Sequence, residues 1–219
     1  MGTLVTVGVD IGQRRDPTAI AVVEQEERRD TETHHMVRHL ERLPLGSPYP
    51  AVAERVAAVV GGVHAATPGE SPTLYVDATG VGTPIVDVLR AASVGDLARL
   101  VAVYFTHGDR RKVERGEVKL GKAWLVSRMQ ALLQSGLLHL PRTAEAEALG
   151  KELLDYEIRV TEDANDRYGA FRVGAHDDLV TALGLATQED RGGGEAATSF
   201  RDPYGFGDFP SEGGFWPSW

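Results

Sequence analysis

The sequence predicts an α/β fold in which helices flank a mixed sheet and a flexible C-terminal tail follows. Short runs rich in β-branched residues alternate along the chain with segments whose apolar residues recur at helical spacing. A repeated order of strand, helix and strand is typical of parallel neighbouring strands. After about residue 190 the composition changes to glycine, proline, serine and aromatic residues, which do not form a packed core. We therefore expect one domain over residues 1–189 and a tail over residues 190–219.

The hydrophobic pattern gives the expected elements. Strands are predicted over residues 5–9, 18–24, 34–43, 73–77 and 99–105, and helices over residues 50–65, 84–92, 119–134 and 145–156. A hairpin formed by residues 158–161 and 168–173 is expected next. Asp177 is then predicted to cap a last helix that carries Leu179 and Leu183. This order places acidic residues at the ends of strands and at the start of a helix.

Composition and charge narrow the possible functions. The 219 residues, 42% of them hydrophobic and 25% charged, are typical of a globular protein with one sizeable core, and we expect it to be soluble and intracellular. The absence of cysteine excludes disulfides, thiolate zinc sites and cysteine nucleophiles. A net charge of −9 argues against a protein that coats nucleic acid. Within this acidic chain, one stretch is locally basic and contains Arg110, Arg111, Lys112, Arg115, Lys119, Lys122 and Arg128.

Aspartates stand at three widely separated points of the predicted fold. Asp10 and Asp77 each end a buried strand, and the pair Asp177 and Asp178 opens an apolar helix. Taken singly, each has a structural interpretation, since aspartate is common in turns and at helix N-caps. The carboxyl ends of neighbouring parallel strands meet at one edge of a sheet, however, and a helix that packs across them brings the third acid there. We therefore expect the carboxylates to share one small volume.

Carboxylates gathered in this way suit hard divalent cations. Mg²⁺ and Mn²⁺ prefer oxygen ligands, and two such ions about 3.5 to 4 Å apart can hydrolyse a phosphodiester. In this arrangement Asp10 is expected to bridge the two ions, Asp77 to bind one, and Asp177 or Asp178 to bind the other. Adjacent residues on a helix point about 100° apart, so the sequence does not decide between the members of the pair.

Four segments, in this order, resemble the nuclease domain of the large terminase subunit of tailed bacteriophages: VGVDIGQRRDPTAIAVVE, YVDATGVGTPIVDVL, VKLGKAWLVSRMQALLQSGLLHL and GAHDDLVTALGLA. The resemblance covers residues 3–187. It implies an RNase H-like fold and Mg²⁺- or Mn²⁺-dependent endonucleolytic cleavage of concatemeric double-stranded DNA during viral genome packaging. By motif, Asp10, Asp77 and the pair Asp177 and Asp178 are the metal-binding, catalytic acids. His176 and Asp16 are candidates for an assisting role.

The resemblance also predicts where the protein acts and what it contacts. It implies a place in the packaging motor at the procapsid portal, in the cytoplasm of the infected bacterium. Basic residues are then expected to contact the DNA backbone, although a solvated loop and helix face explains them equally well. The predicted contacts are Arg110, Arg111, Lys112, Lys119 and Lys122.

We expect the chain to be an excised nuclease domain, because the packaging ATPase domain that full-length family members carry is missing from it. Residues 116–123 do fit the phosphate-loop pattern GxxxxGK. Ala123 stands where a magnesium-binding Ser or Thr is needed, however, and the preceding segment RRKVERGE is charged, unlike a buried strand. We therefore do not interpret these residues as a phosphate loop.

The tail contains aromatic residues of the kind found in partner-binding segments, although disorder alone also explains its composition. Large aromatic contacts can offset the cost of ordering a flexible segment. The family resemblance makes docking to the portal protein the preferred hypothesis. The residues concerned are Phe200, Tyr204, Phe206, Phe209, Phe215, Trp216 and Trp219.

Two other function classes remain open. Sugar kinases and actin-like ATPases place similar aspartate turns around nucleotide phosphates, but they usually close two such domains over the nucleotide and have no role for the string HDDLVTAL. A non-catalytic, portal-binding module, whose acids only cap helices, is the second alternative. Metal-dependent DNA cleavage distinguishes the nuclease from both.

Overall fold

The computed structural model describes residues 4–12, 16–28, 32–80, 83–106, 110–114, 116–160, 166–169 and 177–188. In this part of the chain eight strands form one mixed sheet in the order β6-β7-β5-β4-β1-β2-β3-β8. Their bounds are β1 (Leu4–Asp10), β2 (Ala19–Glu27), β3 (Thr33–Arg42), β4 (Thr73–Asp77), β5 (Arg99–Thr106), β6 (Arg111–Glu114), β7 (Glu117–Gly121) and β8 (Leu138–His139). The fold is the predicted mixed sheet with flanking helices. The tail after residue 189 lies outside the described residues.

Parallel pairing at the centre of the sheet aligns the strand ends. β1 pairs parallel with β4, Val9 opposite Val76, and β4 pairs parallel with β5. On the other side of β1, strands β2 and β3 continue the sheet in antiparallel order. The carboxyl ends of β1 and β4 therefore lie next to each other, as the strand–helix–strand pattern predicted.

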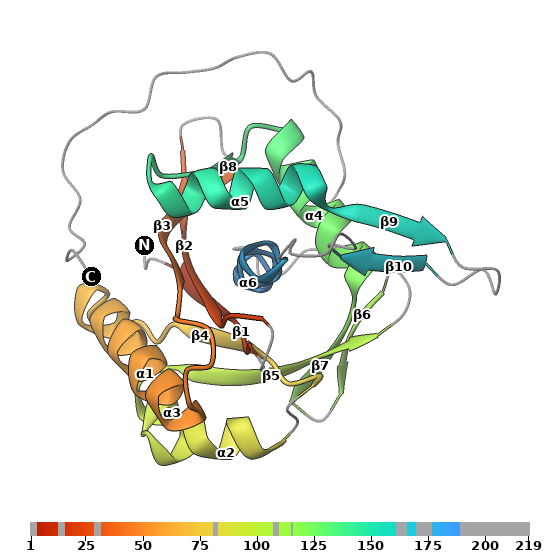
Figure 1. Ribbon diagram of the computed structural model, residues 1–219. Coiled ribbons are helices and arrows are strands. Elements are labelled where there is room, and N and C mark those ends of the chain that lie inside the picture. The colour runs from red at the N-terminus through yellow and green to blue at the C-terminus, as the bar shows by residue number, and fades with distance from the viewer. Residues whose placement is uncertain are drawn as a thin grey trace.

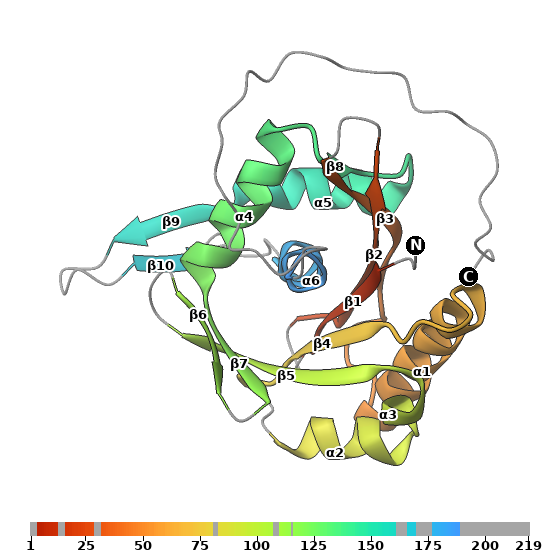
Figure 2. The same ribbon diagram turned by 180° about the vertical axis from the view of Figure 1, so that it is seen from behind.

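Helices cover the sheet in two layers (Figure 1). One face is covered by α1 (Tyr49–Ala66), α2 (Thr83–Ala91) and α3 (Val94–Leu97). On α1, residues Val52, Val56, Val59, Val60 and Val63 recur at helical spacing and are buried. The other face is covered by α4 (Lys122–Gln134), α5 (Ala144–Asp155) and α6 (Asp178–Ala186). Seen from behind, α6 again lies at the centre, between the sheet and the pair α4 and α5 (Figure 2).

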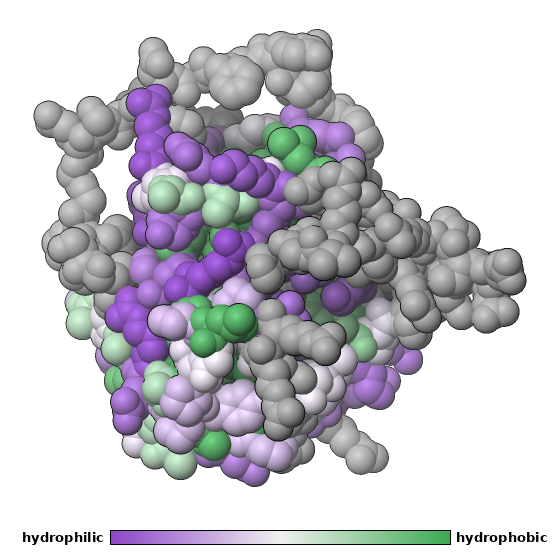
Figure 3. Space-filling view, viewed as in Figure 1, coloured by the Kyte–Doolittle hydropathy of each residue, from purple (hydrophilic) through white to green (hydrophobic). Residues whose placement is uncertain are grey.

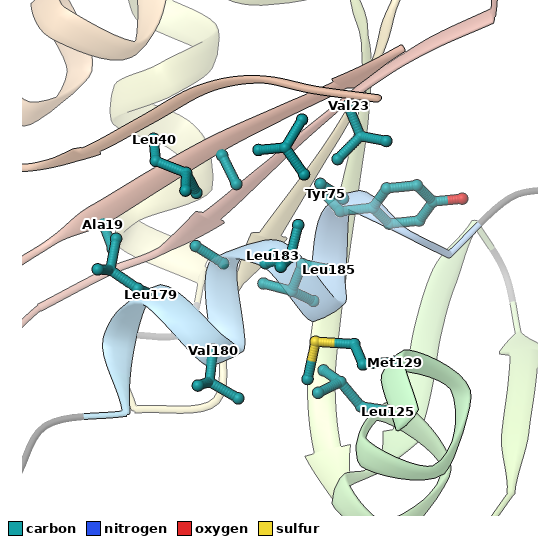
Figure 4. Close-up of a cluster of buried hydrophobic side chains, with 14 of the residues drawn as sticks. Ala19, Val23, Leu40, Tyr75, Leu125, Met129, Leu179, Val180, Leu183 and Leu185 are labelled. Carbon is teal, nitrogen blue, oxygen red and sulfur yellow. The ribbon is translucent and has the colours of Figure 1, made fainter. Parts of the chain in front are cut away.

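The central helix α6 is buried along its whole length, and its backbone touches the sheet. All nine of its residues are buried, and its apolar side chains pack between β1–β3 and α4 (Figure 4). A Cβ added at Gly8 of β1 would overlap the carbonyl oxygen of Ala182 and the amide nitrogen of Ala186. Thr6 donates a hydrogen bond to the carbonyl oxygen of Ala186. Only glycine at position 8 permits this approach.

The basic segment differs from the prediction. We expected a loop followed by a helix from Lys119, but residues 117–121 form strand β7, which pairs antiparallel with β6. The helix begins only at Lys122. Because residues 117–121 are extended, they do not form a phosphate loop, which confirms the rejection of the GxxxxGK match. The short elements α3, β6 and β8 were also not predicted.

The hairpin before α6 is present with shifted ends. Strand β9 (Glu157–Val160) pairs antiparallel with β10 (Asp166–Gly169). The predicted extension to residue 173 lies outside the described residues.

The described surface carries apolar residues only in small groups. On the face shown in Figure 3, hydrophilic and pale residues cover most of the coloured area, and the hydrophobic ones are scattered. The exposed large apolar side chains are Leu45, Tyr49, Val113, Leu133 and Leu154. No helix within the described ranges is long and apolar enough to cross a membrane.

The approach of α6 to β1 predicts that Gly8→Ala destabilises the protein. The added methyl group must push the helix backbone away from the strand, and overpacking of this kind costs about 1–3 kcal/mol. The melting temperature should fall by about 2–4 °C for each kcal/mol. The matched control is Gly150→Ala in α5, where a Cβ meets nothing within 4 Å. It should raise the melting temperature, because glycine weakens a helix. Equal effects of the two substitutions would contradict this packing.

Candidate metal centre

Asp10 and Asp77 lie side by side on the face of the sheet that α6 covers. Thr6 and Gly8 of β1 touch α6, and side chains alternate along a strand, so Asp10 faces the same way. Tyr75 of β4 packs in the cluster around α6, and Asp77 follows it by two residues. Both carboxylates stand at the carboxyl ends of their strands, and both are partly exposed.

The helix α6 brings the other two acids to the same edge. Asp177 occupies the N-cap position of α6, and Asp178 is the first residue of the helix. Asp177 is partly exposed, whereas Asp178 is only 2% exposed. The hydrogen bond from the amide of Thr181 to the carbonyl oxygen of Asp177, 2.9 Å long, closes the first helical turn. The helix that buries its apolar side chains against β1 thus begins beside Asp10.

The pKa values of Asp10 and Asp77 are shifted by burial and by the charges around them. Burial raises the pKa of Asp10 well above its ordinary value, and repulsion from Asp77, Asp177 and Asp178 raises it further, whereas Lys122 opposes the rise. Burial also raises the pKa of Asp77, against hydrogen bonds from Thr79 that favour the charged form.

The two members of the aspartate pair differ in their surroundings. Repulsion from Asp177 acts on both Asp10 and Asp77. Asp178 instead accepts a hydrogen bond from Nε of Arg42 on β3, 2.5 Å long. Asp177 thus repels both strand acids, whereas Asp178 repels Asp10 and is also held by Arg42.

The donor set fits a hard divalent cation. Its oxygens belong to carboxylates that repel one another, and a cation would remove this repulsion. In the described part of the chain no three His, Asp or Glu side chains stand close enough together to hold one ion as they are. Asp77 accepts a hydrogen bond from the amide of Thr79, 2.8 Å long.

The two candidates for an assisting role are placed differently. Asp16 is exposed in the loop after β1, and its carbonyl oxygen lies where a Cβ of Gly12 would stand. The amide of Gly12 donates to Oγ1 of Thr18, 2.9 Å away, which closes this loop. His176 lies outside the described residues.

The predicted DNA contacts divide between the two faces of the sheet. Lys119 lies opposite Tyr104 and beside Lys112, on the face away from the carboxylates. Both lysines are paired with Glu114, Lys119 at 2.6 Å and Lys112 at 3.5 Å.

The other predicted contacts lie nearer the acids. Arg111 pairs with Leu120, whose side chain packs around α6, so Arg111 faces the side of the carboxylates. Lys122 begins α4, and its Nζ stands 5.4 Å from the centroid of the Phe105 ring. Arg110 precedes β6 and is exposed.

Several solved terminase nuclease domains are similar to this chain in architecture. The large terminase nuclease of the thermophilic phage G20c with bound magnesium matches with a TM-score of 0.61 and 21% identity, over 84% of this chain and 80% of that chain. The manganese-soaked terminase nuclease domain of human cytomegalovirus matches with a TM-score of 0.54 and 16% identity, over 85% and 83%. The large terminase nuclease domain of phage SPP1 with bound manganese matches with a TM-score of 0.51 and 11% identity, over 84% of each chain.

The chain has the fold of a large terminase nuclease domain. The fold that the resemblance of the four sequence segments implies is thus confirmed. No protein-family model matches the sequence, and no curated protein matches it either.

Two residues that contact the start of α6 were not predicted from the sequence. Arg42 ends β3 and Glu152 lies on α5, and together they contact the start of α6. Neither belongs to a motif. Glu152 does fall on the apolar side of its helix, which is an unusual place for a glutamate and the one signal that marks it.

The repulsion at Asp10 predicts that Asp10→Asn stabilises the metal-free protein at pH 7. The neutral amide removes the cost of a buried charge beside other carboxylates. Melting in EDTA should give a higher temperature for the variant, by about 2–4 °C for each kcal/mol of repulsion removed. Asp87→Asn, at an exposed carboxylate on α2, is the control and should change little.

The difference in melting temperature between Asp10→Asn and wild type should depend on pH. The folded-state pKa of Asp10 lies above its unfolded value, so the native state holds the proton more tightly. The contribution of Asp10 to the stability of the wild-type protein therefore becomes less unfavourable as the pH falls from neutral through the raised pKa. The melting temperature of wild type should then approach that of Asp10→Asn. A difference in melting temperature that stays constant down to pH 4.5 would contradict the assigned repulsion.

Proposed function

We propose that this protein is a divalent-metal-dependent endonuclease that cleaves concatemeric double-stranded DNA during viral genome packaging. The observation that carries the proposal is the convergence of Asp10, Asp77 and Asp177 at one edge of the sheet, in a fold shared with terminase nucleases. Several of the similar structures hold bound magnesium, manganese or cobalt or were soaked with manganese, which supports a metal-dependent reaction.

The acids divide the work of holding Mg²⁺ or Mn²⁺. Asp10, Asp77 and Asp177 are the residues that would hold the ions. Asp178, held by Arg42, supports this arrangement from the core. Bound divalent cations supply a hydroxide nucleophile at neutral pH and stabilise the charge on the leaving oxygen.

The basic groups on the side of the carboxylates hold the DNA. Lys122 acts on both Asp10 and Asp77 in the metal-free protein, so it stands close to where a scissile phosphate must lie. Arg111 extends the positive charge along the hairpin β6–β7 on this side, and Arg110 is exposed just before β6. Phosphate contacts of this type carry no sequence information, and we expect cleavage with little sequence preference.

The family also supplies the setting of the reaction. The proposed partners are double-stranded DNA, the packaging ATPase domain of the full-length terminase, and the portal protein through residues 190–219. The site of action is then the packaging motor at the procapsid portal in the infected bacterium. Contact of the tail with the portal stays a prediction.

Nicking of supercoiled plasmid tests the proposed activity. Wild type should convert the plasmid to open-circular and linear forms with Mg²⁺ or Mn²⁺ and not in EDTA. Asp10→Asn, Asp77→Asn and Asp177→Asn should fall to the EDTA background, because each removes a charged ligand. The control Asp87→Asn should cut like wild type.

Three outcomes would refute the nuclease assignment. They are cutting in EDTA, equal cutting by the ligand variants, and no cutting under any metal. ATP hydrolysis without nicking would favour the kinase-like alternative instead.

DNA binding should depend on the face that carries the basic residues. The pair Arg111→Ala and Lys122→Ala should weaken binding, and should reduce the slope of log K against log salt by about 1 for each lost phosphate contact. The matched control removes Lys112 and Lys119, the same charge on the opposite face. Binding measured by fluorescence anisotropy in Ca²⁺ at several salt concentrations separates the two. Equal losses for both pairs would show that charge alone, and not this face, determines binding.

A further inference from the structure

The start of α6 is capped by a residue from another helix. An aspartate at an N-cap ordinarily accepts a hydrogen bond from the second or third amide of its helix. Among the described residues Asp177 makes no such side-chain bond. The third amide, that of Val180, donates instead to Oε2 of Glu152 on α5, 3.1 Å away. The prediction that Asp177 caps the helix is therefore right about position and wrong about the hydrogen bond.

Glu152 is held in place by Arg42. The glutamate is 6% exposed, so its charge needs a partner. The guanidinium of Arg42 forms an ion pair with Glu152 through one terminal nitrogen and donates from Nε to Asp178. Arg42 belongs to β3, so this cluster joins a strand, α5 and the first turn of α6. The positive end of the helix dipole also favours the two carboxylates there.

We propose that Glu152 and Arg42 are positioning residues of the metal centre. Glu152 caps α6 in place of Asp177, which leaves the Asp177 carboxylate available to the divalent cation, and Arg42 fixes both Glu152 and Asp178. This inference rests on the proposed function, because it assumes that Asp177 is a metal ligand.

Capping and metal binding compete for the same carboxylate. When the side chain of an N-cap aspartate accepts hydrogen bonds from amides of its own helix, its oxygens are turned toward those amides. Removal of Glu152 leaves the amide of Val180 without its buried acceptor, and Asp177 is the nearest residue that can replace it. A loss of the cap from α5 should therefore cost metal affinity as well as stability.

Manganese titration calorimetry tests the positioning role. Glu152→Ala should weaken Mn²⁺ binding on the order of 10- to 100-fold, the usual cost of losing a residue that supports a metal ligand. Glu152→Gln keeps an acceptor oxygen for Val180 and should recover most of this loss.

The matched control is Glu41→Ala. Glu41 of β3 pairs with Arg55 of α1, at 2.9 Å, on the opposite face of the sheet. The control should lower the melting temperature while leaving Mn²⁺ affinity unchanged. Wild-type affinity in Glu152→Ala, or an equal loss of affinity in Glu41→Ala, would overturn the positioning role.

Melting in EDTA tests the exchange of caps without any metal. In wild type, Asp177→Ala should leave the melting temperature unchanged or raise it, because Asp177 makes no cap bond and repels Asp10. In the Glu152→Ala background the same substitution should lower it by about 2–4 °C, since Asp177 has then become the cap.

An equal change in melting temperature on Asp177→Ala in wild type and in Glu152→Ala would show that Asp177 does not replace Glu152 as the cap. If Glu152→Ala does not fold, the comparison with Glu152→Gln decides, where Asp177→Ala should behave as it does in wild type. Failure of wild type to bind Mn²⁺ would instead refute the proposed function and with it the positioning role. The melting experiment would still decide which residue caps α6.

Discussion

The contact between the backbones of α6 and β1 is the constraint on which the candidate site depends. Gly8 lets the helix rest directly on the strand, and Thr6 adds a hydrogen bond to the helix end at Ala186. Because α6 is buried on every side, its position is fixed by apolar packing along its whole length. The rigid helix therefore sets where its first residues lie relative to Asp10. Apolar packing in the core thus determines where the charged groups at the edge of the sheet lie.

The placement has an electrostatic cost that the fold only partly offsets. Asp10 and Asp77 are held where burial and mutual repulsion disfavour their charged forms. Lys122 relieves both carboxylates from the start of α4, but one lysine does not balance several acids. The apolar core stabilises the fold enough to offset this electrostatic cost. It includes the buried valines of α1 on the opposite face of the sheet. A site that is unfavourable when empty binds a cation more strongly, because the ion removes the repulsion.

Much of this arrangement followed from the sequence, and the exceptions have physical reasons. Strands β1 and β4 carry continuous β-branched or apolar runs, so their ends at Asp10 and Asp77 were predictable. The hairpin β6–β7 was missed because its strands are short and rich in charge, although Val118 and Leu120 alternate with polar residues. Strand β8 contains two residues and has no periodicity to detect.

The contacts around α6 could not be predicted from the sequence for a different reason. The ion pair of Arg42 with Asp178 joins residues 136 positions apart, and no local pattern indicates which buried acid an arginine will meet. The sequence also left open which member of the aspartate pair serves the site. The structure distinguishes their surroundings: Asp178 is the first residue inside the helix and is buried, while Asp177 before it is partly exposed.

Two adjacent aspartates with the same side-chain chemistry can therefore have different surroundings and different roles. Asp178 is drawn into the core by Arg42, which anchors the first turn. Asp177 stays beside the strand acids on condition that something else caps the helix, and Glu152 meets that condition from α5. In the proposed site, the helix that carries Asp177 would thus depend on α5 for the cap at its start. The packing of α5 against α6 is then the contact through which the proposed positioning role of Glu152 would act.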